Sequence, residues 1–130
     1  MSNAAIRRLV GVYDADGTIR GELAYFVGAR LGRRHCALCD ITHGAVRERD
    51  EWRTCRAALP IPFETVHRND QPAAVRALLS GVYPAVVAET DDDWVLLLGP
   101  DELEACHSSS DALMSSIETV SRQLGLRWRT

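Results

Sequence analysis

The chain of 130 residues contains 46% hydrophobic and 25% charged residues, a composition typical of one folded domain with its own core. Its formal net charge of -3 argues against nucleic-acid binding as the main task, because a phosphate backbone is usually met by a basic surface. No stretch approaches the roughly 20 apolar residues that span a bilayer, and the N-terminus lacks the order of a secretory signal. We therefore expect a single domain over residues 1–130, cytoplasmic, with neither membrane nor nucleic acid as partner.

The first third of the sequence predicts a strand that leads into a helix. A short apolar run over residues 9–13 is typical of a strand, and residues 14–17 have the composition of a turn. From Thr18, apolar residues recur at helical spacing as far as Leu31, and Gly32 suits the end of a helix. Residues 36–44 are then expected to form a loop that carries two cysteines.

The remaining two thirds predict alternating helices and strands. Periodicity and turn residues define each boundary, with prolines ending or starting several elements. An acidic turn at residues 91–93 predicts a hairpin. The expected elements are a helix over 46–59 with Trp52, Cys55 and Leu59 on one face, a strand over 63–67, a helix over 73–79, strands over 85–89 and 94–98, a short helix to Cys106, and a helix with Leu113, Ile117, Val120 and Leu124 in one stripe.

The pattern with the most chemical content is Cys36-Ala-Leu-Cys39. Amides at the start of a helix stabilise a thiolate and lower its pKa, and the basic residues at 33–35 would act in the same direction. Thiol–disulfide exchange needs only an attacking and a resolving thiol with access to a partner. We therefore interpret Cys36 as the attacking and Cys39 as the resolving thiol, with a protein disulfide or a small thiol as partner and no cofactor.

Two alternatives remain open for the same segment. Zinc or another soft metal prefers four ligands, so Cys36 and Cys39 would need His43 and His67 to complete a set. Asp40, Cys55, Cys106 and His107 are further possible ligands. The other alternative is an interaction domain in which both thiols are small buried residues of a structural loop. Cys55 and Cys106 lie at helical spacing among apolar neighbours and are expected in the core.

Carboxylates and a histidine also lie near predicted strand ends. Asp14 and Asp16 lie at the first strand-to-helix turn, where paired carboxylates can hold a hard cation, although turn formation explains them with fewer assumptions. His67 follows a predicted strand and could reach a site at strand ends, but a surface histidine in a turn is the simpler interpretation.

The order of the predicted elements resembles the thioredoxin-like fold, an α/β fold with a central mixed sheet of about four strands flanked by helices. In that family a proline directly before the third strand is usually cis and lies beside the active site, and Pro84 occupies the corresponding place here. The resemblance implies a positioning role for Pro84. Thioredoxins carry their Cys-x-x-Cys pair at the end of the first strand, whereas here the pair lies in a helical insertion after the first predicted helix.

A second resemblance rests on the motif Cys-x-Leu-Cys-x-Ile-Thr-His-Gly at residues 36–44, together with Glu51-Trp52 and His67. This pattern is similar to that of a family of small uncharacterised bacterial proteins. The resemblance implies no particular activity.

Overall fold

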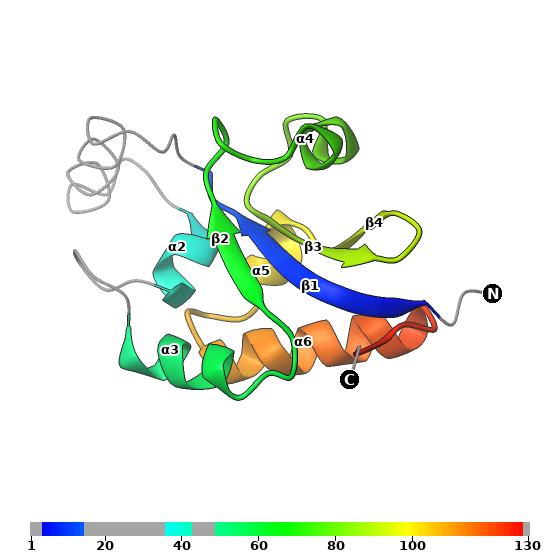
Figure 1. The fold of residues 1–130 in the computed structure, drawn as a ribbon. Coiled ribbons are helices and arrows are strands. Elements are labelled where there is room, and N and C mark those ends of the chain that lie inside the picture. Colours follow the sequence, from blue (N-terminus) through cyan, green and yellow to red (C-terminus); the bar gives the residue numbers. More distant parts are fainter. Residues whose placement is uncertain (1–3, 15–35, 43–48, 129–130) are drawn as a thin grey trace.

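A mixed β-sheet organises the fold (Figure 1). In the computed structural model the described residues are 4–14, 36–42 and 49–128. Strand β1 (Ala5–Val12) runs parallel to β2 (Phe63–Val66) and antiparallel to β3 (Ala85–Thr90). Strand β4 (Trp94–Leu98) extends the sheet, which has the order β2-β1-β3-β4, and the two-residue β5 (Arg127–Trp128) pairs with the start of β1. The protein therefore belongs to the α/β class.

Helices cover both faces of this sheet, as Figure 1 shows. Helix α4 (Ala73–Leu79) packs on one face, where its buried side chains join Val10, Val12 and Val87. The opposite face carries the larger core, which takes buried side chains from four helices. These are α2 (Ala37–Thr42), α3 (Asp50–Ala57), α5 (Pro100–Glu104) and α6 (Ser110–Gln123). In the described part of the chain, no helix combines the length and the apolar character needed to cross a membrane.

A register shift in β1 determines which residues face each core. The pairing of β1 with β3 is irregular between Ile6 and Arg8, so Ile6 and Leu9, three residues apart, both lie in the larger core. A bulge of this kind inserts one residue and restores the alternation beyond it. From Leu9 onward, odd-numbered residues face the larger core and even-numbered residues face α4.

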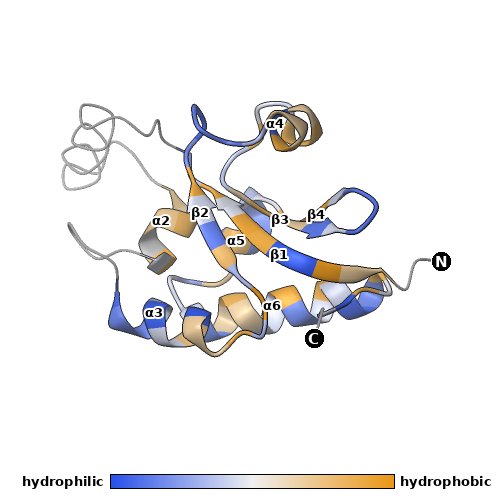
Figure 2. Cartoon of the chain, viewed as in Figure 1, coloured by the Kyte–Doolittle hydropathy of each residue, from blue (hydrophilic) through white to orange (hydrophobic). Residues whose placement is uncertain are grey.

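Charged residues lie on the part of the sheet that α4 does not cover. Arg8 donates from Nε to Glu89 at 2.9 Å and from Nη1 to Glu64 at 3.0 Å, and it lies over the ring of Trp94. This one guanidinium thus joins side chains from all four main strands. Figure 2 shows apolar stretches in the sheet and a hydrophilic turn between β3 and β4.

The structure agrees with the predicted hairpin, the helix over 73–79 and the strand that begins at Phe63. Residues 37–42, expected as a cysteine-bearing loop within a helical insertion, form a helix, and the structure differs at β1, which starts at Ala5. The apolar stripe of the last helix ends early, because Leu124 is 44% exposed. Cys55 is only partly buried: its thiol donates to Asp111 at 3.5 Å, so its expected place in the core was wrong. The helix predicted over 18–31 lies outside the described residues.

Gly11 provides a test of how closely α2 packs on β1. A Cβ at this position would lie 3.0 Å from Cδ2 of Leu38 and 3.3 Å from Cε1 of Phe63, two side chains that are buried. Gly11→Ala should therefore lower the free energy of unfolding by about 1–3 kcal/mol, as overpacking of a core does. Chemical denaturation measures this change.

Gly99→Ala is the matched control. Its Cβ would meet only Oε1 of Glu102, at 3.1 Å; this exposed side chain accepts from the Gly99 amide at 2.7 Å and can shift without disturbing the core. The control should lower the free energy of unfolding by less than Gly11→Ala does. Equal stability of the Gly11→Ala variant and the parent would contradict tight packing of α2 on β1.

Candidate functional site: the Cys36–Cys39 pair

Cys36 and Cys39 lie together at the start of α2. Cys36 directly precedes the helix, and Cys39 is in its first turn. The backbone N–H of Cys39 donates to Sγ of Cys36 at 3.3 Å. Neither residue is in a disulfide. The two thiols that the sequence singled out are therefore brought together, with Cys36 as the acceptor.

The pKa of Cys36 is lowered from its ordinary value. The largest cause is a hydrogen bond from the side chain of Cys39, and the backbone amides of Asp14 and Cys39 act in the same direction. Burial and the negative charge of Asp14 oppose this by disfavouring the thiolate. The hydrogen bonds prevail, so the thiolate of Cys36 is favoured relative to that of an ordinary cysteine.

The pKa values of Cys55 and Cys106 are shifted in the opposite direction, to higher values. Burial is the main cause that raises the pKa of each thiol, and Asp111 raises that of Cys55 further. Cys106 is buried in the core, as expected from the sequence. Raised pKa values leave both thiols protonated, which separates them chemically from Cys36.

Two contacts hold α2 against the end of β1. Leu38 lies over Gly11, and the hydroxyls of Tyr13 and Thr42 share a hydrogen bond of 2.8 Å. Thr42 is fully buried, so this hydrogen bond satisfies a polar group inside the core. Through these contacts the cysteines lie where β1 ends, although the sequence places them more than twenty residues later.

Both sulfurs are covered by the surrounding protein. Cys36 is 1% exposed and Cys39 is 7% exposed, and both belong to the larger core with Leu38. A partner molecule can therefore react with Cys36 only after a local opening of the structure.

Pro84 lies at the same end of the sheet. Ala85 pairs with Val12, so Pro84 is opposite the point at which the chain leaves β1 toward Asp14. The Tyr83–Pro84 peptide bond is cis, and Pro84 is buried. Tyr83 packs toward α4 and accepts a hydrogen bond from Gln71 at 2.6 Å. Pro84 and the cysteines thus lie at the same end of the sheet.

Of the remaining predicted site residues, some lie at this end of the sheet and others fall outside the described residues. His67 follows β2 at this same end, with its ring centroid 5.4 Å from that of Tyr13, and its backbone N–H donates to Asp70. Asp14 forms an ion pair with Arg68 at 3.3 Å. His43 and Asp16 lie outside the described residues. Within residues 4–14, 36–42 and 49–128, no three His, Cys, Asp or Glu side chains are grouped as metal ligands would be.

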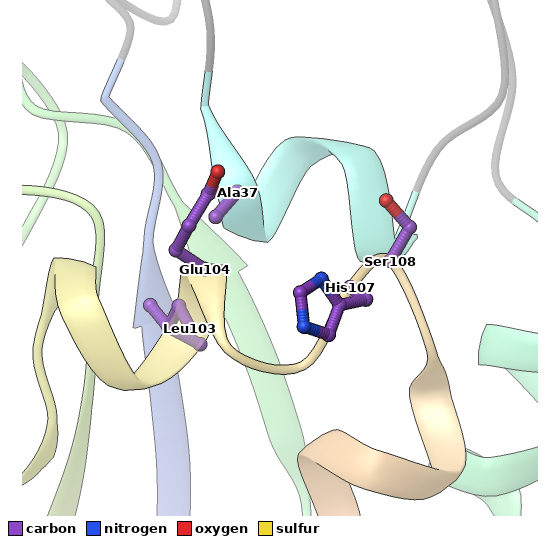
Figure 3. Close-up of a pocket in the computed structure, with 5 residues that line it drawn as sticks. All are labelled: Ala37, Leu103, Glu104, His107 and Ser108. Carbon is purple, nitrogen blue, oxygen red and sulfur yellow. The ribbon is translucent and has the colours of Figure 1, made fainter.

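A pocket borders the cysteine helix on the side of α5 (Figure 3). It has a volume of about 270 Å³ and is lined by Ala37, Leu103, Glu104, His107 and Ser108. Of these residues, only His107 was singled out by the sequence, as a possible metal ligand. No sequence signal marked the pocket, because its residues meet only when α5 packs beside α2.

The fold and the thiol pair define a small α/β protein with an activated cysteine next to a second thiol. Comparisons with protein-family models, curated proteins and solved structures give no match. The function must therefore be inferred from the site itself.

The Cys39 side chain can be tested as the group that acidifies Cys36. Cys39→Ala removes the largest cause of the lowered pKa, so the pKa of Cys36 should rise. The rate of alkylation of Cys36 by iodoacetamide follows the thiolate fraction. Its midpoint should shift to higher pH in the variant, as measured by mass spectrometry of the labelled peptide.

Cys106→Ala serves as a matched loss of a buried thiol, because Cys106 donates to the Glu102 carbonyl and is not among the causes of the Cys36 pKa shift. It should leave the midpoint unchanged. A Cys39→Ala profile that overlays the parent profile would show that Cys39 does not stabilise the Cys36 thiolate.

Proposed function

We propose that this chain has a thioredoxin-like fold and acts as a thiol–disulfide redox protein through Cys36 and Cys39. The single observation that carries the proposal is the hydrogen bonding of Cys36, whose sulfur accepts from the amide and the thiol of Cys39. A buried structural cysteine ordinarily has a raised pKa, as Cys106 does. A lowered pKa beside a second thiol is the property that disulfide exchange requires.

The sheet supports the same assignment. The strands have the order β2-β1-β3-β4, with β1 parallel to β2 and antiparallel to β3, which is a mixed sheet of the kind that the thioredoxin resemblance implies. In sequence, the cysteine pair departs from that family, because it follows the first predicted helix and does not lie at the end of the first strand. In space the departure is small, because the amide of Asp14, two residues beyond β1, hydrogen-bonds Cys36.

The reaction proceeds in two exchanges. The Cys36 thiolate attacks one sulfur of a partner disulfide, the partner's S–S bond breaks, and the released thiolate takes a proton. Cys39 then loses its proton and attacks the Cys36 sulfur of the mixed disulfide, which releases the second partner thiol. The products are a Cys36–Cys39 disulfide and two partner thiols, so two electrons pass to the partner.

Each residue at the site has a defined part in this scheme. Cys36 is the nucleophile, and Cys39 first donates a hydrogen bond to it and later resolves the mixed disulfide. The Asp14 amide stabilises the Cys36 thiolate, and Pro84 positions the partner chain at this end of the sheet. The reaction needs the burial of the sulfurs to be relieved by a local opening around the cysteines.

Trapping of the mixed disulfide tests this function. In a Cys55→Ala background, Cys39→Ser should accumulate a mixed disulfide at Cys36 when treated with 2-hydroxyethyl disulfide, because no resolving thiol remains. Cys36→Ser should accumulate far less, and the intact pair should form an internal disulfide. Intact-mass and peptide mass spectrometry distinguish the three products.

Metal analysis of protein purified without chelator separates the alternatives. Stoichiometric zinc that masks two thiols until a chelator is added would overturn the redox function in favour of a metal site. Two free thiols that never form a disulfide, and whose serine variants change only stability, would leave an interaction domain with a structural cysteine segment.

A further inference from the structure

Strand β4 forms an open edge of the sheet (Figure 1). β3 lies on one side of β4, and no described strand lies on the other. Backbone N–H and C=O groups alternate between the two sides of a strand, so half of those in β4 face away from β3. Among the described residues, no backbone group outside β3 is hydrogen-bonded to residues 94–98. This edge is therefore available to a further strand.

The side chains of β4 divide between a covered and an exposed face. Leu97 and Leu98 both lie in the larger core, because the pairing of β4 with β3 is irregular between Val86 and Val87. Leu96 pairs with Val87, whose side chain faces α4, and Leu96 is 43% exposed. An apolar side chain of the open edge thus lies partly uncovered on the face that carries α4.

Helix α4 presents a second exposed leucine toward this edge. Arg76 and Leu78 are about 200° apart around the helix, because successive residues turn by about 100°. Arg76 extends toward β2, since its Nη2 donates at 3.1 Å to the carbonyl of Arg68, which follows that strand. Leu78, which is 40% exposed, therefore lies on the side of α4 that faces β4, and the two elements are in contact. Leu78 and Leu96 thus border the same part of the edge.

Both ends of β4 are acidic. The turn before β4, residues 91–93, consists of three exposed aspartates, and Asp101 is exposed in the first turn of α5, which follows β4. Arg7 offsets the charge of Asp91 at 3.7 Å, whereas Asp92 and Asp101 form no ion pair among the described residues. Between residues 91 and 104 the sequence contains no arginine or lysine. The edge is therefore an apolar strand with negative charge at each end.

These charges argue against a second copy of the chain as the occupant of the edge. Two copies that pair antiparallel through β4, with Leu96 on the twofold axis, place Asp91 of each copy opposite Asp101 of the other. Like charges directly opposite each other destabilise a strand pair. The bulge at Leu97 and the short length of β4 are further features by which natural edges limit pairing between copies. A segment with positive charge at its ends meets attraction where a second copy meets repulsion.

We propose that the β4 edge binds an extended segment of another protein by strand addition, and that this segment has an apolar centre and a basic residue at each end. One apolar side chain of the segment packs between Leu78 and Leu96, and its basic residues lie beside Asp92 and Asp101. Basic residues at both ends suit either strand direction, because both ends of β4 are acidic. In strand addition, main-chain hydrogen bonds give affinity and side-chain contacts give specificity. The proposal does not depend on the chemistry of Cys36.

Three synthetic peptides provide the test. The first is Arg-Thr-Val-Thr-Val-Thr-Arg, the second has glutamate in place of each arginine, and the third has proline in place of the central threonine, which removes a strand donor. Each peptide is titrated into isotope-labelled protein, and the backbone amide signals are followed by NMR. The arginine peptide should cause saturable shifts that are largest at residues 94–98. The other two peptides should bind at least about fivefold more weakly, because one has the wrong charge and the other cannot extend the sheet.

Two variants locate the binding surface. Leu96→Lys should weaken binding of the arginine peptide by about tenfold or more, because it removes an apolar contact and adds a like charge. Leu124→Lys is the matched control, since Leu124 is 44% exposed directly after α6, and it should bind as the parent does. Asp92→Asn combined with Asp101→Asn should weaken binding by about two- to fivefold, and added salt should weaken it in the parent. Circular dichroism verifies that each variant is folded.

The remaining outcomes decide against the proposal. Equal binding of the three peptides, shifts that avoid residues 94–98, or full affinity in Leu96→Lys would overturn it. Sedimentation equilibrium of the protein alone tests the other occupant: a monomer is expected, and a dimer that Leu96→Lys dissociates would identify a second copy at this edge. Trapping of the mixed disulfide at Cys36 is a separate measurement, so the redox function stands or falls independently of these results.

Discussion

The docking of α2 on the end of β1 is the constraint on which the site depends. Gly11 has no side chain, so Leu38 can approach the sheet and bring the whole helix with it. The hydrogen bond between Tyr13 and Thr42 fixes the other end of the helix. Without this close approach the amide of Asp14 would not reach Cys36, and the thiolate would lose a donor that comes from the sheet.

The same docking of α2 sets the acidity of the Cys36 thiol against its access to a partner. Burial in the core disfavours a charged sulfur, yet hydrogen bonds from two amides and one thiol more than compensate. Desolvation also strengthens each of those bonds, because charges interact more strongly where water is absent. A cysteine with a lowered pKa at this position is acidified but covered, so its acidity and its access to a partner oppose each other.

Much of the fold could be predicted from the sequence, because local signals and the tertiary structure agree there. The helix over 73–79 begins after Pro72, and the hairpin turns at consecutive acidic residues. Prediction failed at the start of β1, where the bulge places Ile6 and Leu9 on one face and interrupts the alternation by which a strand is recognised. A short helix at 37–42 likewise depends on packing against Gly11, a contact between residues far apart in the chain.

The candidate site was predictable in part for similar reasons. Two cysteines three positions apart meet on any helical turn, so their proximity followed from spacing alone. Their burial, and the direction of the pKa of Cys36, depend on long-range contacts with β1. The pocket was missed because left-handed turns are recognised by glycine or asparagine, and neither occurs at His107 or Ser108.

The short strand β5 has a consequence for how the molecule can be handled. It pairs with Ala5 and Ile6 on the same edge of β1 that β2 uses further along, and Arg127 donates to the carbonyl of Ala4 at 3.3 Å. The first and last described residues therefore lie side by side, as Figure 1 shows, at the end of the sheet remote from the cysteines. A fluorophore or carrier protein attached at either extremity would leave the thiol pair and its neighbouring pocket unobstructed.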